Sequence, residues 1–306
     1  MFLEKAEQIR LKSMSGVELD EYLLDAEPEE EQEIPSGAVS SADALSEDAG
    51  KERRKANSRR SVADGENRLS VSGLKKHFGR KQVVKGVGFY VRGGDIAGLL
   101  GPNGAGKTTI FYMIVGFLRP NAGVVKLNQY EITTGPMYKR AQLGIAYLPQ
   151  EASIFRKLTV EQNIYAVLET RRDLSKAEKM QKLEALIEDF GIERIRKQAG
   201  YTLSGGERRR TEIARALAIE PKFLLLDEPF AGIDPIAVYD IKQIILKLAG
   251  RGIGILITDH NVRDTLEITN DALIISDGVI VARGTKDLIL NNQMVRDIYL
   301  GSNFKM

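Results

Sequence analysis

The 306-residue chain contains no cysteine and no tryptophan, and only 7% of its residues are aromatic. The absence of cysteine excludes disulfides and metal sites built from thiolates. No apolar run approaches the roughly 18 residues that a membrane-spanning helix needs, and residues 1–5 lack the apolar core of a secretory signal. We therefore expect a cytoplasmic protein that cannot itself form a path through a membrane.

Charge is distributed unevenly along the chain. Residues 1–66 carry 9 Lys and Arg against 17 Asp and Glu, a net charge of −8, whereas residues 67–306 carry 35 against 25, a net charge of +10. Blocks of like charge with few aromatic residues are typical of disorder. We predict that residues 1–66 form a flexible extension, in which residues 1–24 have the spacing of a short amphipathic helix or of one that forms only transiently. The positive surplus suits a solvated surface and a nucleotide site, and it does not by itself predict nucleic-acid binding.

A glycine-rich loop with the pattern G-x-x-x-x-G-K-[ST] occupies residues 101–108, between an apolar run at 96–100 and another at 110–115. These runs predict a buried strand before the loop and a buried helix after it, and this context distinguishes a phosphate-binding loop from a glycine-rich turn without a ligand. Backbone N–H groups of such a loop, with the start of the helix, bind phosphate oxygens. The lysine reaches the β- and γ-phosphates, and the threonine hydroxyl ligates Mg²⁺. The predicted nucleotide-binding residues of the loop are Gly101, Pro102, Asn103, Gly104, Ala105, Gly106, Lys107, Thr108 and Thr109.

Strands and helices alternate through the rest of residues 67–306. This alternation predicts an α/β fold with a mostly parallel sheet, whose ligands lie at the carboxyl ends of the strands. The helix after the phosphate loop is expected to end near residues 119–120. Strands are expected at 69–71, 83–91, 124–128, 144–150, 222–228 and 254–260, helices at 159–215 and 236–248, and a hairpin at 272–282 around Asp277-Gly278.

Asp227 and Glu228 end one apolar strand, and His260 ends another. An acid at this position can hold Mg²⁺, and a second acid can deprotonate the water that attacks a γ-phosphate. Acids at a strand end can also be merely solvated, and a lone histidine is usually structural. The phosphate loop upstream favours a chemical role for all three.

The order of these motifs resembles that of ABC-type ATPases over residues 67–306. The phosphate loop, Gln150, Leu-Ser-Gly-Gly-Glu at 203–207, the two acids, residues 231–234 and His260 follow one another as in that family. The resemblance implies a P-loop NTPase of ABC type, with a mostly parallel core sheet, an antiparallel β subdomain and an inserted helical subdomain at about 151–217.

The resemblance also implies roles for single residues, with ATP and Mg²⁺ as the bound groups. Phe78 would stack on adenine, where tyrosine is commoner, although a strand aromatic can equally be a core residue. Ser204 and Gly206 would grip the γ-phosphate of a nucleotide held by a second copy of the chain. The implied nucleotide contacts outside the loop are Phe78, Ser204, Gly205, Gly206 and Asp234; the implied magnesium ligands are Thr108, Gln150 and Asp227; the implied catalytic residues are Glu228 as base, His260 and Gln150.

Within the family, five segments are similar to the ATPases of lipopolysaccharide exporters, from whose compact pattern residues 1–66 depart. That similarity implies a homodimer, peripheral to the cytoplasmic face of the inner membrane, that binds two transmembrane permease subunits and drives lipopolysaccharide extraction. The alternatives are an importer ATPase, such as one for branched-chain amino acids, and a soluble ABC ATPase acting on nucleic acid. The second alternative usually needs a long coiled-coil insertion or a second cassette, and the sequence has neither. The five segments are 147–156, 203–217, 223–235, 257–266 and 299–306.

Phe155 and Arg156 follow Gln150 by a few residues, and we predict that they contact the membrane subunits. The competing interpretation places Phe155 in the core of the helical subdomain. The three arginines at 208–210 are consecutive on a predicted helix and spread over about 200° of its surface. They cannot all serve one site, so at least one is expected on a solvated face.

Overall fold

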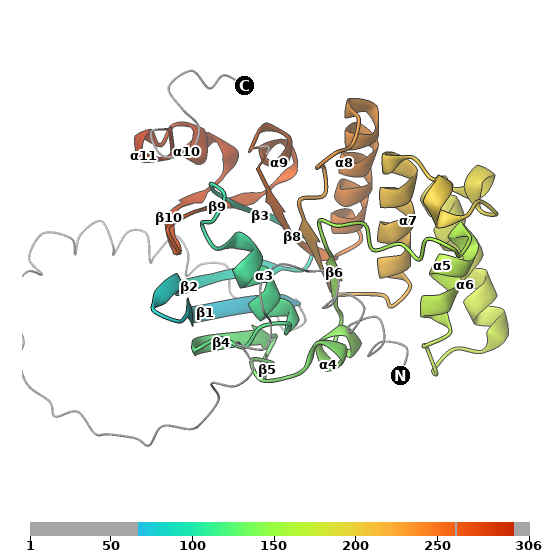
Figure 1. Ribbon diagram of the computed structural model, residues 1–306, viewed down its shortest axis with the longest axis horizontal. Coiled ribbons are helices and arrows are strands. Elements are labelled where there is room, and N and C mark those ends of the chain that lie inside the picture. The colour runs from blue at the N-terminus through green and yellow to red at the C-terminus, as the bar shows by residue number, and fades with distance from the viewer. Residues whose placement is uncertain (1–66, 261, 297–306) are drawn as a thin grey trace, which may run out of the picture. The chain divides into compact units, whose positions relative to one another are not determined.

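The structure, a computed structural model, describes residues 67–260 and 262–296 (Figure 1). All of these residues belong to one compact unit, Val62–Met306. The predicted extension at 1–66 and the segment 299–306 lie outside the described residues, so what we expect of them stays a prediction. Among the residues described, no helix has the length and apolar character that crossing a membrane requires.

Within the described residues the strands form two sheets. They are β1 (Arg68–Phe78), β2 (Lys81–Arg92), β3 (Ile96–Leu100), β4 (Ala122–Leu127), β5 (Tyr130–Glu131), β6 (Ile145–Leu148), β7 (Phe223–Asp227), β8 (Gly254–Asp259), β9 (Asp271–Ser276) and β10 (Val279–Gly284). One sheet is antiparallel, in the order β2-β1-β4-β5, and the other has the order β10-β9-β3-β8-β7-β6. In the second sheet every neighbouring pair is parallel except β10 and β9. The predicted mostly parallel core sheet and antiparallel β subdomain are therefore confirmed.

The helices cover the two sheets and form a separate group beside them. Figure 1 shows α3 between the sheets and α5, α6 and α7 together on the far side of β6. The helices are α3 (Lys107–Val115), α4 (Met137–Gln142), α5 (Val160–Leu168), α6 (Lys176–Asp189), α7 (Gly205–Leu217), α8 (Pro235–Gly250), α9 (Val262–Ile268), α10 (Lys286–Leu290) and α11 (Gln293–Val295), with 3-10 turns η2 (Glu193–Ile195) and η3 (Gly200–Thr202). The group of α5, α6 and α7 lies in the stretch predicted to be helical.

Local sequence accounts for where the helices of that group begin. Ser175 starts α6 and Ser204 starts α7, each with a glutamate three residues later, and each pair forms a reciprocal capping box. The apolar residues of α6 recur every three or four positions, which places them on one face. Leu183, Ile187 and Phe190 are buried on that face and pack against α5 and α7.

The predicted end of the phosphate-loop helix was wrong. We expected the helix to continue to residues 119–120, but α3 ends at Val115 because Gly116 adopts a left-handed conformation with φ of 88°. Arg140, on the unpredicted helix α4, is buried and donates hydrogen bonds of 2.7 Å and 2.6 Å to the carbonyls of Met113 and Ile114. A guanidinium at this point satisfies the last carbonyls of α3 and interacts favourably with its negative end.

The predicted hairpin near the end of the described chain is confirmed. Asp277 and Gly278 connect β9 to β10, and both have positive φ, 44° and 76°. This pair of conformations is the one that a tight two-residue hairpin turn requires. The hairpin places β10 at the edge of the core sheet beside β2 of the other sheet.

Candidate active site

The phosphate loop joins a completely buried strand, β3, to helix α3. A Cβ atom at Gly101 would lie 2.1 Å from the carbonyl oxygen of Ile275, so only glycine fits there. The Lys107 side chain is buried, and its Nζ donates hydrogen bonds to the carbonyls of Gly101 at 2.6 Å and Pro102 at 3.0 Å. The loop therefore curls around the ammonium group. Thr108 is exposed in the first turn of α3, where its hydroxyl is accessible to a ligand.

The electrostatic surroundings of Lys107 show which elements meet at the loop. Burial lowers the pKa of its ammonium group, and the negative charges of Glu228, Asp227 and Asp259 oppose that shift. These three carboxylates stand at the ends of β7 and β8, which are neighbours in the sheet. The predicted convergence of the loop and the strand-end acids is thus present in the structure.

Asp227 is the last residue of β7. It is buried, and its two carboxylate oxygens accept hydrogen bonds from the hydroxyls of Thr258 at 2.5 Å and Tyr147 at 3.2 Å. Burial raises the pKa of Asp227, whereas the two hydrogen bonds lower it, and the nearby charge of Glu228 raises it further. A carboxylate that is desolvated and held on both oxygens is prepared to bind a cation.

Glu228 has a strained backbone and two polar neighbours. Its φ of 44° lies in the left-handed region, which is uncommon for a side chain other than glycine. Its Oε2 accepts a 2.8 Å hydrogen bond from Nε2 of Gln150 and lies 3.3 Å from Nδ1 of His260. All three residues implied as catalytic therefore meet at one carboxylate oxygen.

Arg209 is a site residue whose role the sequence did not reveal. It is buried on α7, and its guanidinium donates hydrogen bonds to the carbonyls of Pro149 at 2.9 Å and Asp227 at 3.3 Å. It also pairs with buried Glu212 at 3.4 Å, whose other oxygen accepts hydrogen bonds from two backbone N–H groups just after Gln150. The pair ties α7 to the segment carrying Gln150 and to the end of β7.

The Leu-Ser-Gly-Gly-Glu segment has a local structural role at the start of α7. The hydroxyl of Ser204 accepts the Glu207 N–H, and a Cβ at Gly206 would lie 2.6 Å from the Cβ of Ala237. Asp234 similarly caps α8 by accepting the N–H of Ala237 at 3.0 Å. In the part of the chain that the structure describes, no hydrogen bond or ion pair joins residues 204–206 to residues 101–109. One copy of the chain does not bring the two glycine-rich segments together.

The remaining aromatic candidates are partly accessible. Phe78 is half-buried at the end of β1, with Nζ of Lys76 5.4 Å from its ring centroid. Phe155 is 45% exposed, and the guanidinium of Arg215 lies 4.9 Å from its ring centroid. The competing interpretation of Phe155 as a core residue of the helical subdomain was therefore wrong.

Comparison with known proteins shows relatives that align over 78–80% of the chain. A family model described as ABC transporter matches residues 84–231. The lipopolysaccharide export system ATP-binding protein LptB of Haemophilus influenzae is 54% identical over 78% of this chain and 99% of that protein, and LptB of Escherichia coli K12 is 52% identical with the same coverage. A probable ABC transporter ATP-binding protein of Azorhizobium caulinodans is 52% identical over 80% of this chain and 86% of its own.

Solved structures agree with these relatives. The crystal structure of the ADP conformation of MJ1267, an ATP-binding cassette of an ABC transporter, is similar to this chain with a TM-score of 0.69 and 28% identity. The similarity covers 77% of this chain and 99% of that one. Together with the phosphate loop and the strand-end acids, these findings show that the chain belongs to the ABC transporter family, as one of its ATP-binding subunits that hydrolyse ATP.

Proposed function

We propose that this ATPase drives lipopolysaccharide export from the inner membrane. The support is its identity of 52–54% with the LptB proteins, which align over 99% of their length. The same relatives do not favour the importer alternative. The observation that carries the chemical part of the proposal is the convergence of Lys107, Asp227 and Glu228 at one edge of the sheet.

The residues present fit a nucleotide with Mg²⁺. Gly101 lets the loop pass close to the carbonyl of Ile275, Thr108 presents a hydroxyl, and Asp227 and Gln150 would add oxygen ligands. Among the described residues no group of three or more His, Cys, Asp or Glu side chains forms a metal site. One hydroxyl, one carboxylate and one amide oxygen suit Mg²⁺, which proteins commonly hold through one or two carboxylates together with substrate phosphates. Bound Mg²⁺ would neutralise charge on the phosphates.

Glu228 is proposed to act as the base that takes a proton from the attacking water. Gln150 donates to one oxygen of its carboxylate, and His260 lies beside the same oxygen, so both orient the group. Lys107 would bind the β- and γ-phosphates, and Phe78, whose ring is partly accessible, would stack on adenine.

The site is proposed to be completed by a second copy of the chain. Ser204, Gly205 and Gly206 begin α7, where backbone N–H groups can bind phosphate. Because they are not joined to the phosphate loop of their own copy, they are proposed to face the nucleotide of the partner in a homodimer, together with Asp234.

The chain is proposed to be peripheral to the cytoplasmic face of the inner membrane and to bind two permease subunits. Phe155 and Arg156 supply the contact, since Phe155 is exposed and its segment is linked through Glu212 to Arg209 and the site. No nucleic-acid partner is expected.

The proposal is tested by purifying the tagged full chain from native membranes in detergent and identifying the proteins that accompany it. The complex is then placed in liposomes that contain lipopolysaccharide, and release of the lipid is followed with and without ATP. We expect two lipid-exporter permeases and ATP-dependent release, with Lys107→Ala as the inactive control. Co-purification with an importer permease and a periplasmic binding protein, or ATPase activity stimulated by DNA without membrane subunits, would contradict it.

A further inference from the structure

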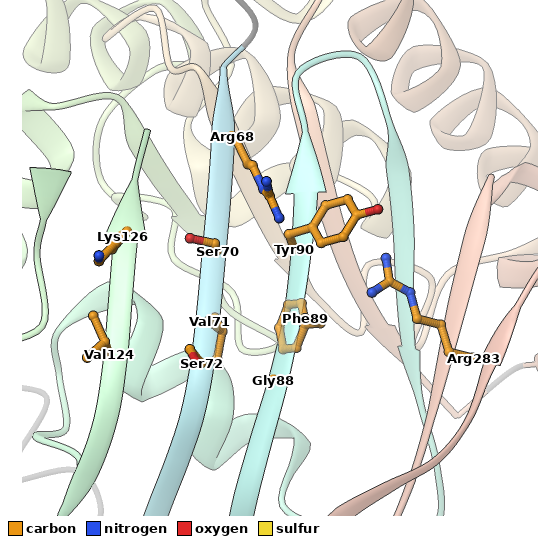
Figure 2. A pocket seen from close by; sticks show the side chains of 10 residues that line it. All are labelled: Arg68, Ser70, Val71, Ser72, Gly88, Phe89, Tyr90, Val124, Lys126 and Arg283. Carbon is orange, nitrogen blue, oxygen red and sulfur yellow. The ribbon is translucent and has the colours of Figure 1, made fainter. Parts of the chain in front are cut away.

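A hollow of about 600 Å³ lies on the antiparallel sheet, at the edge where β10 of the core sheet adjoins β2 (Figure 2). Its polar lining includes Arg68, Ser70, Tyr90, Lys126 and Arg283. None of these residues belongs to the proposed nucleotide site. The pocket is therefore a feature that the ATPase chemistry does not explain.

Strand register places the cations of the pocket close together. Ser70 on β1 lies opposite Tyr90 on β2 and opposite Lys126 on β4, and Arg68 is two residues before Ser70 on the same face. Diagonal neighbours on a sheet are about 7–8 Å apart, within reach of long side chains. Arg68 and Lys126 are therefore diagonal neighbours on the face of the sheet that carries the pocket, and Ser70 lies directly opposite Lys126.

Tyr90 holds the arginines around its ring. The guanidinium carbon of Arg68 lies 4.2 Å from the ring centroid, that of Arg283 4.6 Å and that of Arg92 5.4 Å. In Figure 2 the Arg68 and Arg283 groups lie on either side of the ring. Stacking on an aromatic face orients a guanidinium and leaves its N–H donors free at the edge.

Ion pairs among the described residues neutralise only part of this positive charge. Arg283 forms a 2.6 Å ion pair with Asp271, but within residues 67–260 and 262–296 no ion pair involves Arg68, Arg92 or Lys126. Glu131 lies opposite Lys126 in the register. Nε of Arg68 is buried and has no hydrogen-bond partner. Arg68 and Arg92 are also directly opposed across the strands, an arrangement of like charges that destabilises a sheet unless an anion compensates it.

We propose that this pocket is a second anion site, which binds a phosphate group carried by a soluble phosphate compound or by a lipid headgroup. Guanidinium groups match phosphate oxygens with paired, charge-assisted hydrogen bonds. Within the lining, the guanidinium group of Arg68 and the ammonium group of Lys126, which have no ion pair among the described residues, suit a doubly charged phosphate. The hydroxyls of Ser70 and Tyr90 supply neutral donors at the same surface.

The test uses the full chain saturated with Mg-ADP, so that the phosphate loop is filled. Pyrophosphate binding is measured by calorimetry, and binding to phosphatidylcholine vesicles containing phosphatidic acid is measured by co-sedimentation. We expect saturable binding in at least one arm, and that arm identifies the source of the phosphate. The double variant Arg68→Gln with Lys126→Gln should lose at least tenfold in affinity, whereas Arg68→Lys with Lys126→Arg should retain most of it.

Lys139→Gln with Lys176→Gln removes two exposed charges elsewhere and should stay within about twofold of the wild type. ATP hydrolysis and thermal unfolding show that each variant is folded. Two results would overturn the proposal: no saturable binding in either arm, or equal binding by the Arg68→Gln, Lys126→Gln variant.

Discussion

The side-chain amide of Gln150 donates a 2.8 Å hydrogen bond to the carboxylate of Glu228. Gln150 follows β6 and Glu228 follows β7, two parallel neighbours in the core sheet. The segment after Gln150 is anchored to α7 through Glu212 and continues to the exposed Phe155. A movement of that segment would change the environment of Glu228, the proposed catalytic base. The segment therefore connects the exposed surface at Phe155 to the site of ATP hydrolysis.

The first prediction concerns residues 1–66. A chain that starts at Asn67 should hydrolyse ATP at a rate similar to the full chain, because all proposed site residues lie in the compact unit Val62–Met306. The measurement is steady-state phosphate release by both chains. A loss of more than about tenfold, worth about 1.4 kcal/mol, in a truncated chain that is still folded would show that the extension takes part.

Phe155→Ala should impair assembly with the membrane subunits or transport, and leave nucleotide binding intact. The ring is 45% exposed and stacks with the guanidinium of Arg215, so its removal should leave the packing of the core almost unchanged. Co-purification and lipid release report on the contact, and nucleotide titration reports on the site. Tyr130→Ala, which removes an aromatic ring 60% exposed on β5, is the matched control. Normal export by the Phe155 variant would count against this surface.

Arg209→Met should destabilise the domain. It leaves the buried carboxylate of Glu212 without its guanidinium partner, and breaking one side of a buried ion pair typically costs about 3–5 kcal/mol. In a domain of this size the loss corresponds to a fall in Tm of about 6–20 °C. Arg208→Met, on the neighbouring and less buried residue, is the control for the helix itself. A fall in Tm no larger than that of the control would mean that the ion pair between Arg209 and Glu212 does not stabilise the domain.

Asp227→Asn should make stability less dependent on pH. Burial raises the pKa of Asp227 in the folded chain above its value in the unfolded chain. The contribution of Asp227 to the free energy of unfolding is therefore fully present below the unfolded pKa and is lost as pH rises through the folded pKa. At about pH 8 the buried charge destabilises the folded state, so the Asn variant should unfold at a higher temperature than the wild type. At about pH 5 the difference between the two unfolding temperatures should shrink. Thermal unfolding at both values is the measurement. A gap that widens toward acid pH would contradict the assigned sign.

The sequence predicted the parts of the site that are local. The phosphate loop and the acids at 227 and 228 each depend on a few adjacent residues and on a strand end, and parallel strands bring such ends to one edge. The role of Arg209 was not predictable in this way. Its neighbours Arg208 and Arg210 have the same side chain, and only the packing of α7 against β6 directs the middle one to the carbonyls of Pro149 and Asp227.

Long-range contacts also explain the other misses. Tyr147 and Thr258 hold the two oxygens of Asp227, but they come from different strands and became partners only through the sheet register. The end of α3 was misplaced because the apolar sequence continues past Gly116, whereas the left-handed glycine and the guanidinium of Arg140 end the helix earlier.

The most direct test of the account is Glu228→Gln. Lys107, Thr108 and Asp227 remain, so binding of Mg-ATP should survive, whereas loss of a general base typically costs about 10²–10⁴-fold in rate. Ser204 and Gly206 of the facing copy should keep their contact with the unhydrolysed γ-phosphate, and this linkage should shift the isolated chain from monomer to dimer.

The measurement is size-exclusion chromatography of the Glu228→Gln chain with and without saturating Mg-ATP, beside a hydrolysis assay. The account predicts an inactive protein that is a dimer only with Mg-ATP. Hydrolysis at a rate near the wild type would show that Glu228 is not the base. An inactive protein that stays monomeric at saturating Mg-ATP would contradict the nucleotide site shared between two copies.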